Sequence, residues 1–213
     1  MMKLVIISDS HGKHHKLNLP KGDMLIHAGD VSRSGKPKEV LDFLDWFGQQ
    51  DFKYKIFIAG NHDFYFEHIL EQDLLSIIPK GVIYLNDSGV VIDGINIWGS
   101  PIQPWFHNWA FNRNRGPEIK EHWDLIPLDT DLLITHGPPF GILDKTSKDE
   151  LVGCEDLMSN LENRKVKLHV FGHIHESYGF YQSNRTSYIN ASLLTQYGKM
   201  KNDPVEFSFE ISD

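Results

Sequence analysis

Five short polar clusters are spaced along the chain, and each contains side chains that can bind a divalent cation. Each cluster follows an apolar run and combines Asp, Asn or His with small residues: Asp9-Ser10-His11, Gly29-Asp30, Gly60-Asn61-His62-Asp63, His136-Gly137 and Gly172-His173-Ile174-His175. Hard or borderline divalent cations accept carboxylate oxygens and imidazole nitrogens together, and the two oxygens of an aspartate can bridge two ions. These residue types therefore predict a two-metal centre and favour a metal-dependent phosphoester hydrolase.

Spacing within two of the clusters directs pairs of ligands to one side of the chain. Asp9 and His11 are two residues apart, and His173 and His175 repeat this spacing. In extended backbone, side chains two positions apart point the same way, so each pair can face one site. Ligands of open α/β sheets collect outside the carboxyl ends of the strands. We therefore expect the five clusters to meet at such an edge.

The elements that must position these clusters can be predicted from the apolar pattern. Short, largely β-branched runs that end at polar residues predict strands over 4–7, 24–28, 56–59, 82–85, 90–92, 95–98, 132–135, 168–171, 178–181, 187–190 and 205–211. Asp93-Gly94 predicts a tight hairpin turn between two of these strands. Helical spacing predicts a helix over 38–47, one or two helices over 64–78 and another helix over 151–161.

The order of these elements indicates an α/β fold. Strands alternate with helices early in the chain and give way to β-rich segments later, so that the last three predicted strands would complete a second β group. This order favours a layered α/β sandwich built on two packed sheets. A length of 213 residues, without repeats or an evident linker, predicts a single domain over residues 1–213.

Composition limits the function classes that need consideration. The chain carries a formal net charge of -8, so it lacks the general basic surface that is typical of proteins that bind nucleic acid. We therefore expect no nucleic-acid partner. Cys154 is the one cysteine, which excludes an intramolecular disulfide and suits a cytoplasmic location. The apolar run at 4–7 is too short for a signal peptide or a membrane span, so no membrane association is expected. The oligomeric state is not indicated.

The order of the clusters resembles that of a known family. Asp-x-His, Gly-Asp, Gly-Asn-His-Asp, His-Gly and Gly-His-x-His, found here between residues 4 and 191, are similar to the motifs of the calcineurin-like metallophosphoesterase superfamily. The stretches 55–62, 135–139 and 188–192, with Pro104-Trp105-Phe106, resemble its metallophosphoesterase-domain subfamily of small phosphodiesterases. The resemblance implies a four-layer α/β/β/α sandwich with two packed mixed sheets.

The resemblance also implies a role for each polar residue of the clusters. It assigns one ion to Asp9, His11 and His175, the other to Asn61, His136 and His173, and the bridge between them to Asp30 and a water or hydroxide. His62 would be an acid that is not a ligand, and Asp63 would steer its ring. The cofactors would be two divalent metal ions, with Mn, Fe, Zn, Ni and Mg all left open by oxygen and nitrogen ligands.

Charge explains what such a centre would do. Two divalent cations outweigh the carboxylates of Asp9 and Asp30, so an anionic phosphoester is attracted despite the acidic chain. Metal binding lowers the pKa of water from about 15.7 toward about 7, which supplies hydroxide at neutral pH. An acid such as His62, protonating the leaving oxygen, contributes about 10²–10⁴-fold in rate. The expected partner is a small phosphoester, with a diester in a nucleotide-like or cyclic nucleotide substrate favoured.

The long segment over 99–117 has two interpretations. Its aromatic and basic residues would form a substrate wall in which Trp105 and Phe106 stack on a base and Arg113 and Arg115 pair with phosphate. Alternatively, the segment is an Ω-like loop that is packed by its own aromatic side chains.

Histidines outside the clusters are expected to have structural or solvated positions. His27, inside an apolar run, is typical of a hydrogen-bonded core residue that could also support Asp30. Others, including His14 and His169, are most simply solvated or interface side chains.

Other functions use the same motifs. A phosphomonoesterase or protein phosphatase would need the same centre, because it attacks both kinds of ester, and a nuclease is less compatible with the acidic chain. A scaffold with the same fold and no catalysis is a further alternative. Relatives of that kind usually have eroded ligand positions, and all the ligand positions are present here.

Overall fold

The first of two large sheets carries three of the five clusters. The computed structural model describes residues 1–210, and its first sheet contains β1 (Met2–Ile7), β2 (Met24–Ala28), β3 (Tyr54–Ile58), β4 (Val82–Tyr84) and β13 (Val205–Phe209). The strand order is β13-β1-β2-β3-β4, in which β1 to β4 run parallel and β13 runs antiparallel to β1. Parallel strands place their carboxyl ends at one edge, as a shared site requires.

The second sheet carries the other two clusters. It contains β5 (Ser88–Ile92), β6 (Ile95–Ser100), β9 (Leu132–Thr135), β10 (Leu168–Phe171), β11 (Gly179–Gln182) and β12 (Ser187–Asn190). The order is β11-β12-β10-β9-β6-β5, with four parallel central strands and an antiparallel strand at each edge. Both sheets are therefore mixed, as predicted.

The two sheets pack face to face through aliphatic side chains. Residues such as Ile6, Ile26 and Ile56 of the first sheet share one fully buried cluster with Ile134 and Val170 of the second. The alternate residues of the same strands point to the outer faces, since successive side chains on a strand alternate in direction. Each outer face must then be covered by helices.

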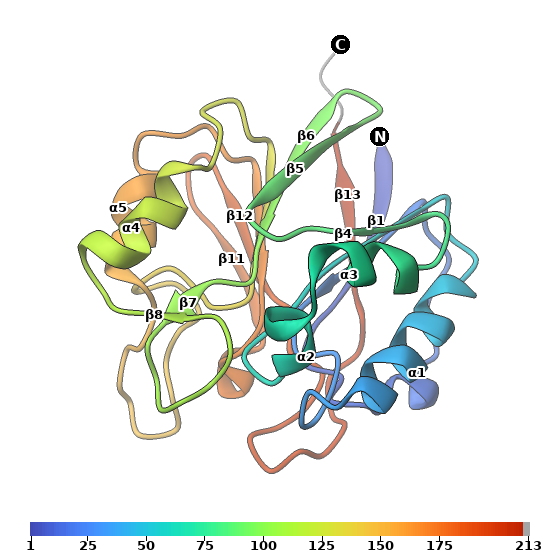
Figure 1. The fold of residues 1–213 in the computed structure, drawn as a ribbon. Coiled ribbons are helices and arrows are strands. Elements are labelled where there is room, and N and C mark those ends of the chain that lie inside the picture. The colour runs from blue at the N-terminus through green and yellow to red at the C-terminus, as the bar shows by residue number, and fades with distance from the viewer. Residues whose placement is uncertain (211–213) are drawn as a thin grey trace.

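Helices cover both outer faces (Figure 1). The first sheet is covered by α1 (Pro37–Gly48), α2 (Phe64–His68) and α3 (Glu71–Ile77), and the second by α4 (Pro117–Asp124) and α5 (Glu155–Leu161). Pro37 stands at the first position of α1, where its missing N–H costs nothing. Phe43 and Phe47, four residues apart, bury the inner face of α1 against the outer face of the first sheet. The predicted four-layer α/β/β/α sandwich is confirmed.

Several predicted boundaries and pairings differ from the structure. The strand predicted over 205–211 ends at Phe209 and joins the first sheet beside β1, not the second β group; Ile211 lies outside the described residues. The predicted helix over 151–161 begins only at Glu155, where the Cys154 sulfur caps the Leu157 N–H. The segment over 64–78 forms two helices.

The long segment over 99–117 contains regular structure that the sequence did not indicate. Within it, β7 (Gln103–Pro104) pairs with β8 (Asn112–Arg113) in a two-stranded parallel sheet. The helix α4 begins directly after Gly116, whose φ is 85°. Ala110 and Phe111 are buried, so the loop is also packed by its own residues, as the Ω-like alternative held.

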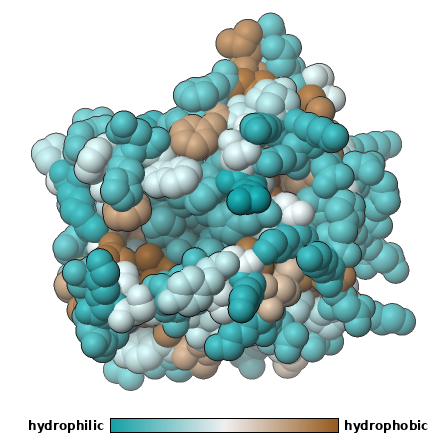
Figure 2. All heavy atoms as spheres, turned by 90° about the horizontal axis from the view of Figure 1, so that it is seen from below, coloured by the Kyte–Doolittle hydropathy of each residue, from teal (hydrophilic) through white to brown (hydrophobic). Residues whose placement is uncertain are grey.

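The strand ends that carry the clusters open on one face of the molecule. Figure 2 looks onto this face, which is hollowed near its middle and largely hydrophilic, with apolar residues at one side. A bridge between Ser8 and Ser192 joins the two sheets at this edge. Two short 3₁₀ helices, η1 (His14–Lys16) and η2 (His175–Ser177), follow the clusters nearby. Within residues 1–210, no helix combines the length and apolar character needed to cross a bilayer.

Candidate metal centre

Asp30 lies at the middle of the assembled polar clusters. One of its carboxylate oxygens is 3.4 Å from Nε2 of His136, and the other is 3.5 Å from Nε2 of His11. Asp30 follows β2 in the first sheet, His11 follows β1, and His136 follows β9 in the second sheet. The carboxylate therefore presents one oxygen to each of two groups of histidines, which is the arrangement expected of a bridging ligand.

One of these groups surrounds Asp9. The ligand atoms of Asp9, His11 and His175 all lie within 4.8 Å of one another. Nε2 of His175 is 3.3 Å from Oδ1 of Asp9, and the backbone N–H of His173 donates to the same carboxylate at 3.0 Å. The first and last of the five clusters thus meet, although they are more than 160 residues apart in the chain.

The other group surrounds His136. Its Nε2 is 2.9 Å from Oδ1 of Asn61, and its ring centroid is 5.0 Å from that of His173. Asp9, Asp30 and His136 form a second group whose ligand atoms lie within 4.8 Å of one another. All seven residues predicted as ligands are therefore brought to one edge of the two sheets.

The backbone at the candidate ligands is held in an uncommon conformation. Asp9, His11, Asp30 and His173 have positive φ values of 55°, 43°, 56° and 66°. Left-handed backbone is sparsely populated by residues other than glycine, and such strain gathers at functional sites. Here it turns the chain sharply at the strand ends and aims these side chains between the sheets.

Glycines beside the ligands leave room for the carboxylates and imidazoles. A Cβ atom on Gly60 would lie 2.4 Å from Oδ1 of Asp30, and one on Gly29 would lie 2.5 Å from Nδ1 of His136. Gly29 also has a φ of 99°, whereas Gly60 does not need positive φ. At Gly60 glycine is therefore required by close packing against the ligands alone, whereas at Gly29 the positive φ favours glycine as well.

The two buried carboxylates are anionic. Burial favours the protonated acid, but the neighbouring histidines, His175 and His136 foremost, hold the pKa of Asp9 well below its usual range. The pKa of Asp30 is likewise lowered, against the effect of burial, chiefly by His136 and His11. In return Asp30, working against burial, raises the pKa of His136 to about 9. The site therefore favours bound positive charge.

The donor set fits divalent cations. Nδ1 of His136 lies 2.9 Å from the Ala28 carbonyl oxygen, and Nδ1 of His175 lies 3.1 Å from that of Thr195. Donation from each Nδ1–H to its carbonyl turns Nε2 toward the aspartates, as in most metal-binding histidines. The pKa of both rings is raised to about 9, so a bound cation would take the place of the Nε2 proton. Burial, and then His136, lower the pKa of His173 to about 3, so its ring is neutral at pH 7. Carboxylate, amide and imidazole donors together suit Mn, Fe, Zn, Ni or Mg.

His62 stands at the rim of this cluster, where its ligand atom lies within 4.8 Å of those of His11 and Asp30. Its Nδ1 is 2.8 Å from the Arg33 carbonyl oxygen, and its Nε2 is 4.0 Å from the Asp30 carboxylate. The ring packs against Trp109 at a centroid distance of 4.2 Å, with the two planes tilted by 33°, and lies edge-on to His11 at 4.6 Å. This position leaves Nε2 near the ligands and open to a substrate.

The structure corrects the role expected for Asp63. Its carboxylate accepts hydrogen bonds from the backbone N–H groups of Val31, Ser32 and Gly60, at 2.9–3.1 Å, and from the Ser32 hydroxyl at 2.7 Å. The His62 ring is oriented by Arg33 and Trp109 instead. Burial, and then Asp30, raise the pKa of Asp63 to about 6. Asp63 thus fastens the loop after β2 to the loop after β3.

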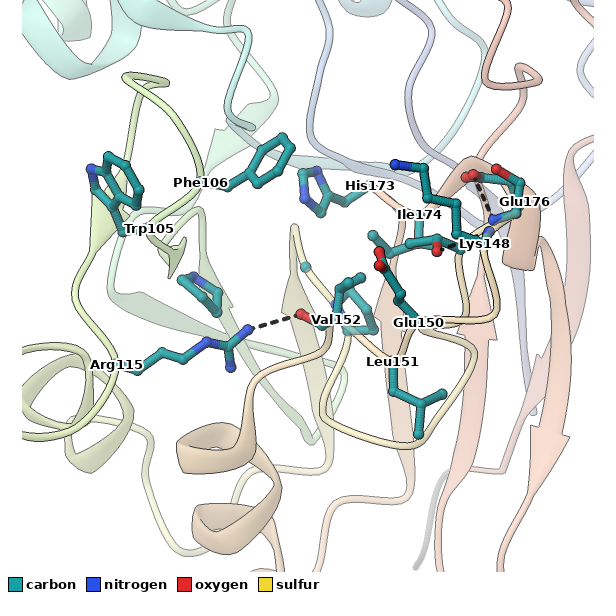
Figure 3. A pocket seen from close by; sticks show the side chains of 15 residues that line it. Trp105, Phe106, Arg115, Lys148, Glu150, Leu151, Val152, His173, Ile174 and Glu176 are labelled. Atoms are coloured by element: carbon teal, nitrogen blue, oxygen red, sulfur yellow. Dashed lines mark hydrogen bonds between the residues drawn. The ribbon is translucent and has the colours of Figure 1, made fainter.

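A cavity of about 500 Å³ opens beside His173 (Figure 3). Trp105 and Phe106 form one side, and Lys148 and Glu176 stand opposite them. Both aromatic side chains are more than half exposed, so their rings are accessible to a molecule in the cavity. Three of the four residues predicted to bind substrate, the two aromatic residues and Arg115, therefore line a cavity next to the candidate centre.

The two arginines predicted to bind substrate lie differently. Arg115 lines the cavity, but its guanidinium donates to the carbonyl oxygens of Gly153 and Val152 and pairs with Glu155. Arg113 is not among the residues that line the cavity, and its Nε donates to His122. Their pairing with phosphate stays a prediction that these contacts do not favour.

Lys148 is a candidate that the sequence did not reveal. It is exposed on the loop after β9, lines the same cavity, and forms no ion pair within residues 1–210. No motif marks this lysine, because its position depends on how a long polar loop folds back over the second sheet.

A second cavity of about 490 Å³ lies beyond His175, lined by polar residues that include Thr195, Gln196 and Tyr197. Glu176 lines both cavities. The candidate centre therefore has one aromatic cavity next to His173 and one polar cavity next to His175.

Three histidines outside the clusters are fully buried. His27 lies 2.9 Å from the Ser10 hydroxyl, as a core histidine should. His169 lies 2.8 Å from the Thr135 hydroxyl, and His14 is buried against α1, so the expectation that these two are solvated or interface side chains is wrong. Burial lowers the pKa of both His27 and His169 to about 3.

Comparison with known proteins agrees with this geometry. The sequence profile of the calcineurin-like phosphoesterase family matches residues 2–177. Human metallophosphoesterase domain-containing protein 1 is 41% identical over an alignment 226 residues long, which covers 95% of this chain and 69% of that protein. The Caenorhabditis elegans protein named UPF0046 protein K07C11.7 is 38% identical, over 97% of this chain and 74% of its own length.

A solved structure shares the fold. The crystal structure of TT1561 of Thermus thermophilus has a TM-score of 0.62 at 12% identity, covering 89% of this chain and 88% of that one. The predicted resemblance in sequence and the predicted fold class are thus both confirmed.

Proposed function

Because this chain belongs to the calcineurin-like phosphoesterase family, we propose that it is a dinuclear-metal-dependent phosphoesterase that prefers small phosphodiesters. The observation that carries the proposal is the position of Asp30, with one carboxylate oxygen near His11 and the other near His136. That geometry supports two cation positions that share Asp30, the first completed by Asp9 and His175 and the second by Asn61 and His173.

The chain's own residues supply the frame for this chemistry. Two divalent cations, when bound, polarise phosphoryl oxygens and lower the pKa of water toward about 7. The backbone carbonyls of Ala28 and Thr195 keep His136 and His175 turned toward the aspartates. This prior orientation matters because phosphoryl transfer depends mainly on positioning and charge stabilisation.

His62 is the proposed acid. With Nδ1 donating to the Arg33 carbonyl, Nε2 points to the rim of the centre, where a leaving oxygen would emerge. In its imidazolium form it can give that oxygen a proton as the ester bond breaks. Packing against Trp109 limits the rotation of the ring and keeps this direction fixed.

The preference for a diester rests on the two cavities. A diester carries two organic groups on its phosphorus, and the candidate centre has one cavity beside His173 and another beside His175. Trp105 and Phe106 would stack on a planar group such as a nucleobase, and Lys148 would pair with an anionic oxygen. A protein phosphatase would instead need a surface that docks a polypeptide.

Turnover of model esters tests the proposal. Hydrolysis of bis-p-nitrophenyl phosphate should require added Mn²⁺, Ni²⁺, Zn²⁺ or Mg²⁺, and its kcat/KM should exceed that of p-nitrophenyl phosphate at least tenfold. No turnover of either ester with any of these ions would overturn the proposed activity. A preference for the monoester would support the phosphomonoesterase alternative.

Aromatic stacking can be tested in the same assay. Trp105→Ala should raise KM for the aromatic diester about tenfold, corresponding to roughly 1.4 kcal/mol of lost stacking. Phe180→Ala is the control, because Phe180 is similarly exposed on β11 but does not line the cavity. Equal KM values for all three proteins would remove Trp105 from substrate binding.

Metal content separates an enzyme from a scaffold that lacks catalysis. Fewer than about one ion per chain after purification without chelator, with no rescue by added metal, would favour the scaffold. The absence of nucleic-acid and membrane partners and the cytoplasmic location stay predictions from the sequence.

A further inference from the structure

A second cluster of metal-binding side chains lies away from the candidate centre, between η1 and α1. Nε2 of His14 is 3.1 Å from Oδ2 of Asp42, and Nε2 of His15 is 3.2 Å from the same oxygen. The two imidazole rings are 4.4 Å apart between centroids. The ligand atoms of all three residues lie within 4.8 Å of one another.

We propose that His14, His15 and Asp42 form a third cation site, suited to Zn²⁺ or a similar borderline divalent ion. Ligands about 2.0–2.2 Å from a tetrahedral zinc lie about 3.3–3.6 Å from each other. The two nitrogen-to-oxygen distances at Asp42 are within about 0.3 Å of that spacing, so a small opening of the side chains would admit the ion. Two imidazoles and one carboxylate are a donor set that zinc accepts.

The side chains are in the protonation states that a cation needs. Burial, and then His15, lower the pKa of His14 to about 4, so its ring is neutral and can offer a lone pair at pH 7. Hydrogen bonds and charge from His15 and His14 lower the pKa of Asp42, although its slight burial acts in the opposite direction. An ionised carboxylate therefore faces at least one neutral imidazole.

Burial divides the three ligands into a fixed one and two accessible ones. The His14 side chain is fully buried and packs against Trp46 and Phe43, at ring-centroid distances of 5.0 and 5.6 Å. The side chains of His15 and Asp42 are 59% and 54% exposed. A cation would therefore meet one rigid ligand and two at the surface, with the remaining position open to water.

The location gives this site a structural consequence. η1 begins three residues after His11 and continues directly from the loop after β1. In that loop, the backbone N–H groups of His11 and Gly12 donate to the backbone carbonyl oxygens of Asp30 and Val31. A cation joining η1 to Asp42 of α1 would hold that loop against the first sheet. It would stabilise the folded protein without entering the candidate centre.

Zinc binding to the whole protein tests the proposal, with zinc alone as the probe. Equilibrium dialysis over a range of free zinc concentrations should find one more zinc per chain in the wild type than in Asp42→Asn or His15→Gln. Asp45→Asn is the matched control, because Asp45 is exposed one turn further along α1 and should leave the count unchanged. Loss of one ligand should weaken the site at least tenfold.

The result is independent of phosphoester hydrolysis. His15 and Asp42 take no part in the proposed catalysis, so both variants should retain the hydrolytic rate of the wild type at saturating metal. If the proposed activity fails, a difference of one zinc per chain would still support the third site. Equal zinc counts and equal affinities in the wild type and both variants would overturn it, whatever the activity.

Discussion

The backbone of Gly172 passes so close to Asp9 that a Cβ atom at position 172 would lie 2.1 Å from the Asp9 carboxylate. This approach lets the backbone N–H of the next residue, His173, donate to the same carboxylate. The loop after β10 and the loop after β1 are therefore fitted to each other at the point where the two sheets meet.

Gly172→Ala should cost at least 100-fold in turnover, because the added methyl must displace Asp9 or the loop that carries His173 and His175. Gly137→Ala is the control: its Cβ would meet only the Gln103 side chain, at 3.8 Å, and should change turnover less than fivefold. Both variants are to be assayed with metal in excess and compared by circular dichroism. Similar rates for the two would contradict the importance of this contact.

Removing the charge of Asp30 tests the proposed bridge. Asn tolerates the positive φ found at this position and keeps the side-chain shape, so Asp30→Asn isolates the lost carboxylate. We expect at least a 1,000-fold loss of turnover together with fewer bound metal ions per chain. Asp51→Asn, in an exposed loop, should change neither quantity. Turnover near that of the wild type in Asp30→Asn would show that Asp30 does not link the cations.

Much of this arrangement could be predicted because it is encoded locally. Strands such as β1 and β9 are short apolar runs, and each ends where the polar ligands begin, so sequence alone locates the ligands at strand ends. Parallel pairing then brings the ends together. The edge position of β13 was missed, because strand pairing between distant segments leaves no local signal.

Side-chain partners across loops were much harder to predict. Asp63 follows His62 directly, yet its four hydrogen bonds go to Val31, Ser32 and Gly60. The burial of His169 likewise depends on its neighbours in the second sheet. Such contacts are set by how two loops or two sheets meet, which the residue order does not specify.

The acid role of His62 predicts a dependence on the leaving group. His62→Gln should slow hydrolysis of diesters with alkoxide leaving groups by about 10²–10⁴-fold, because these need a proton most. Hydrolysis of a p-nitrophenyl ester should slow less than tenfold, and bound metal should stay unchanged. Rates measured across a series of leaving-group pKa values decide the point. An equal loss across the series would leave His62 with no role as an acid.

Asp63 should behave differently from His62. Asp63→Asn places an amide against donors from Val31, Ser32 and Gly60, so at least one buried N–H loses its acceptor, at a cost of about 1–3 kcal/mol in unfolding free energy. Urea unfolding measures this loss. Any loss of rate should be uniform across leaving groups, since Asp63 does not contact the His62 ring. A loss that grows with leaving-group pKa would restore Asp63 to a role in proton transfer.

The buried ring of His169 predicts how stability depends on pH. Burial lowers its folded pKa to about 3, against about 6.5 in the unfolded chain. The stability that the neutral buried ring gives the fold is therefore fully present above pH 6.5 and is lost as the pH falls toward 3. The loss arises because only the unfolded chain takes up the proton in this range. Between pH 6.5 and pH 3, each unit by which the pH falls lowers the unfolding free energy by about 1.4 kcal/mol.

His169→Asn removes this titrating group and can keep a polar contact to Thr135. The wild type should therefore lose stability faster than the variant between pH 6 and pH 4, by about 1.4 kcal/mol per pH unit, in urea unfolding at each pH. Asn163→Ser, which changes an exposed residue that does not titrate, should follow the wild type. Parallel curves for the wild type and His169→Asn would mean that the ring takes up a proton equally in both states.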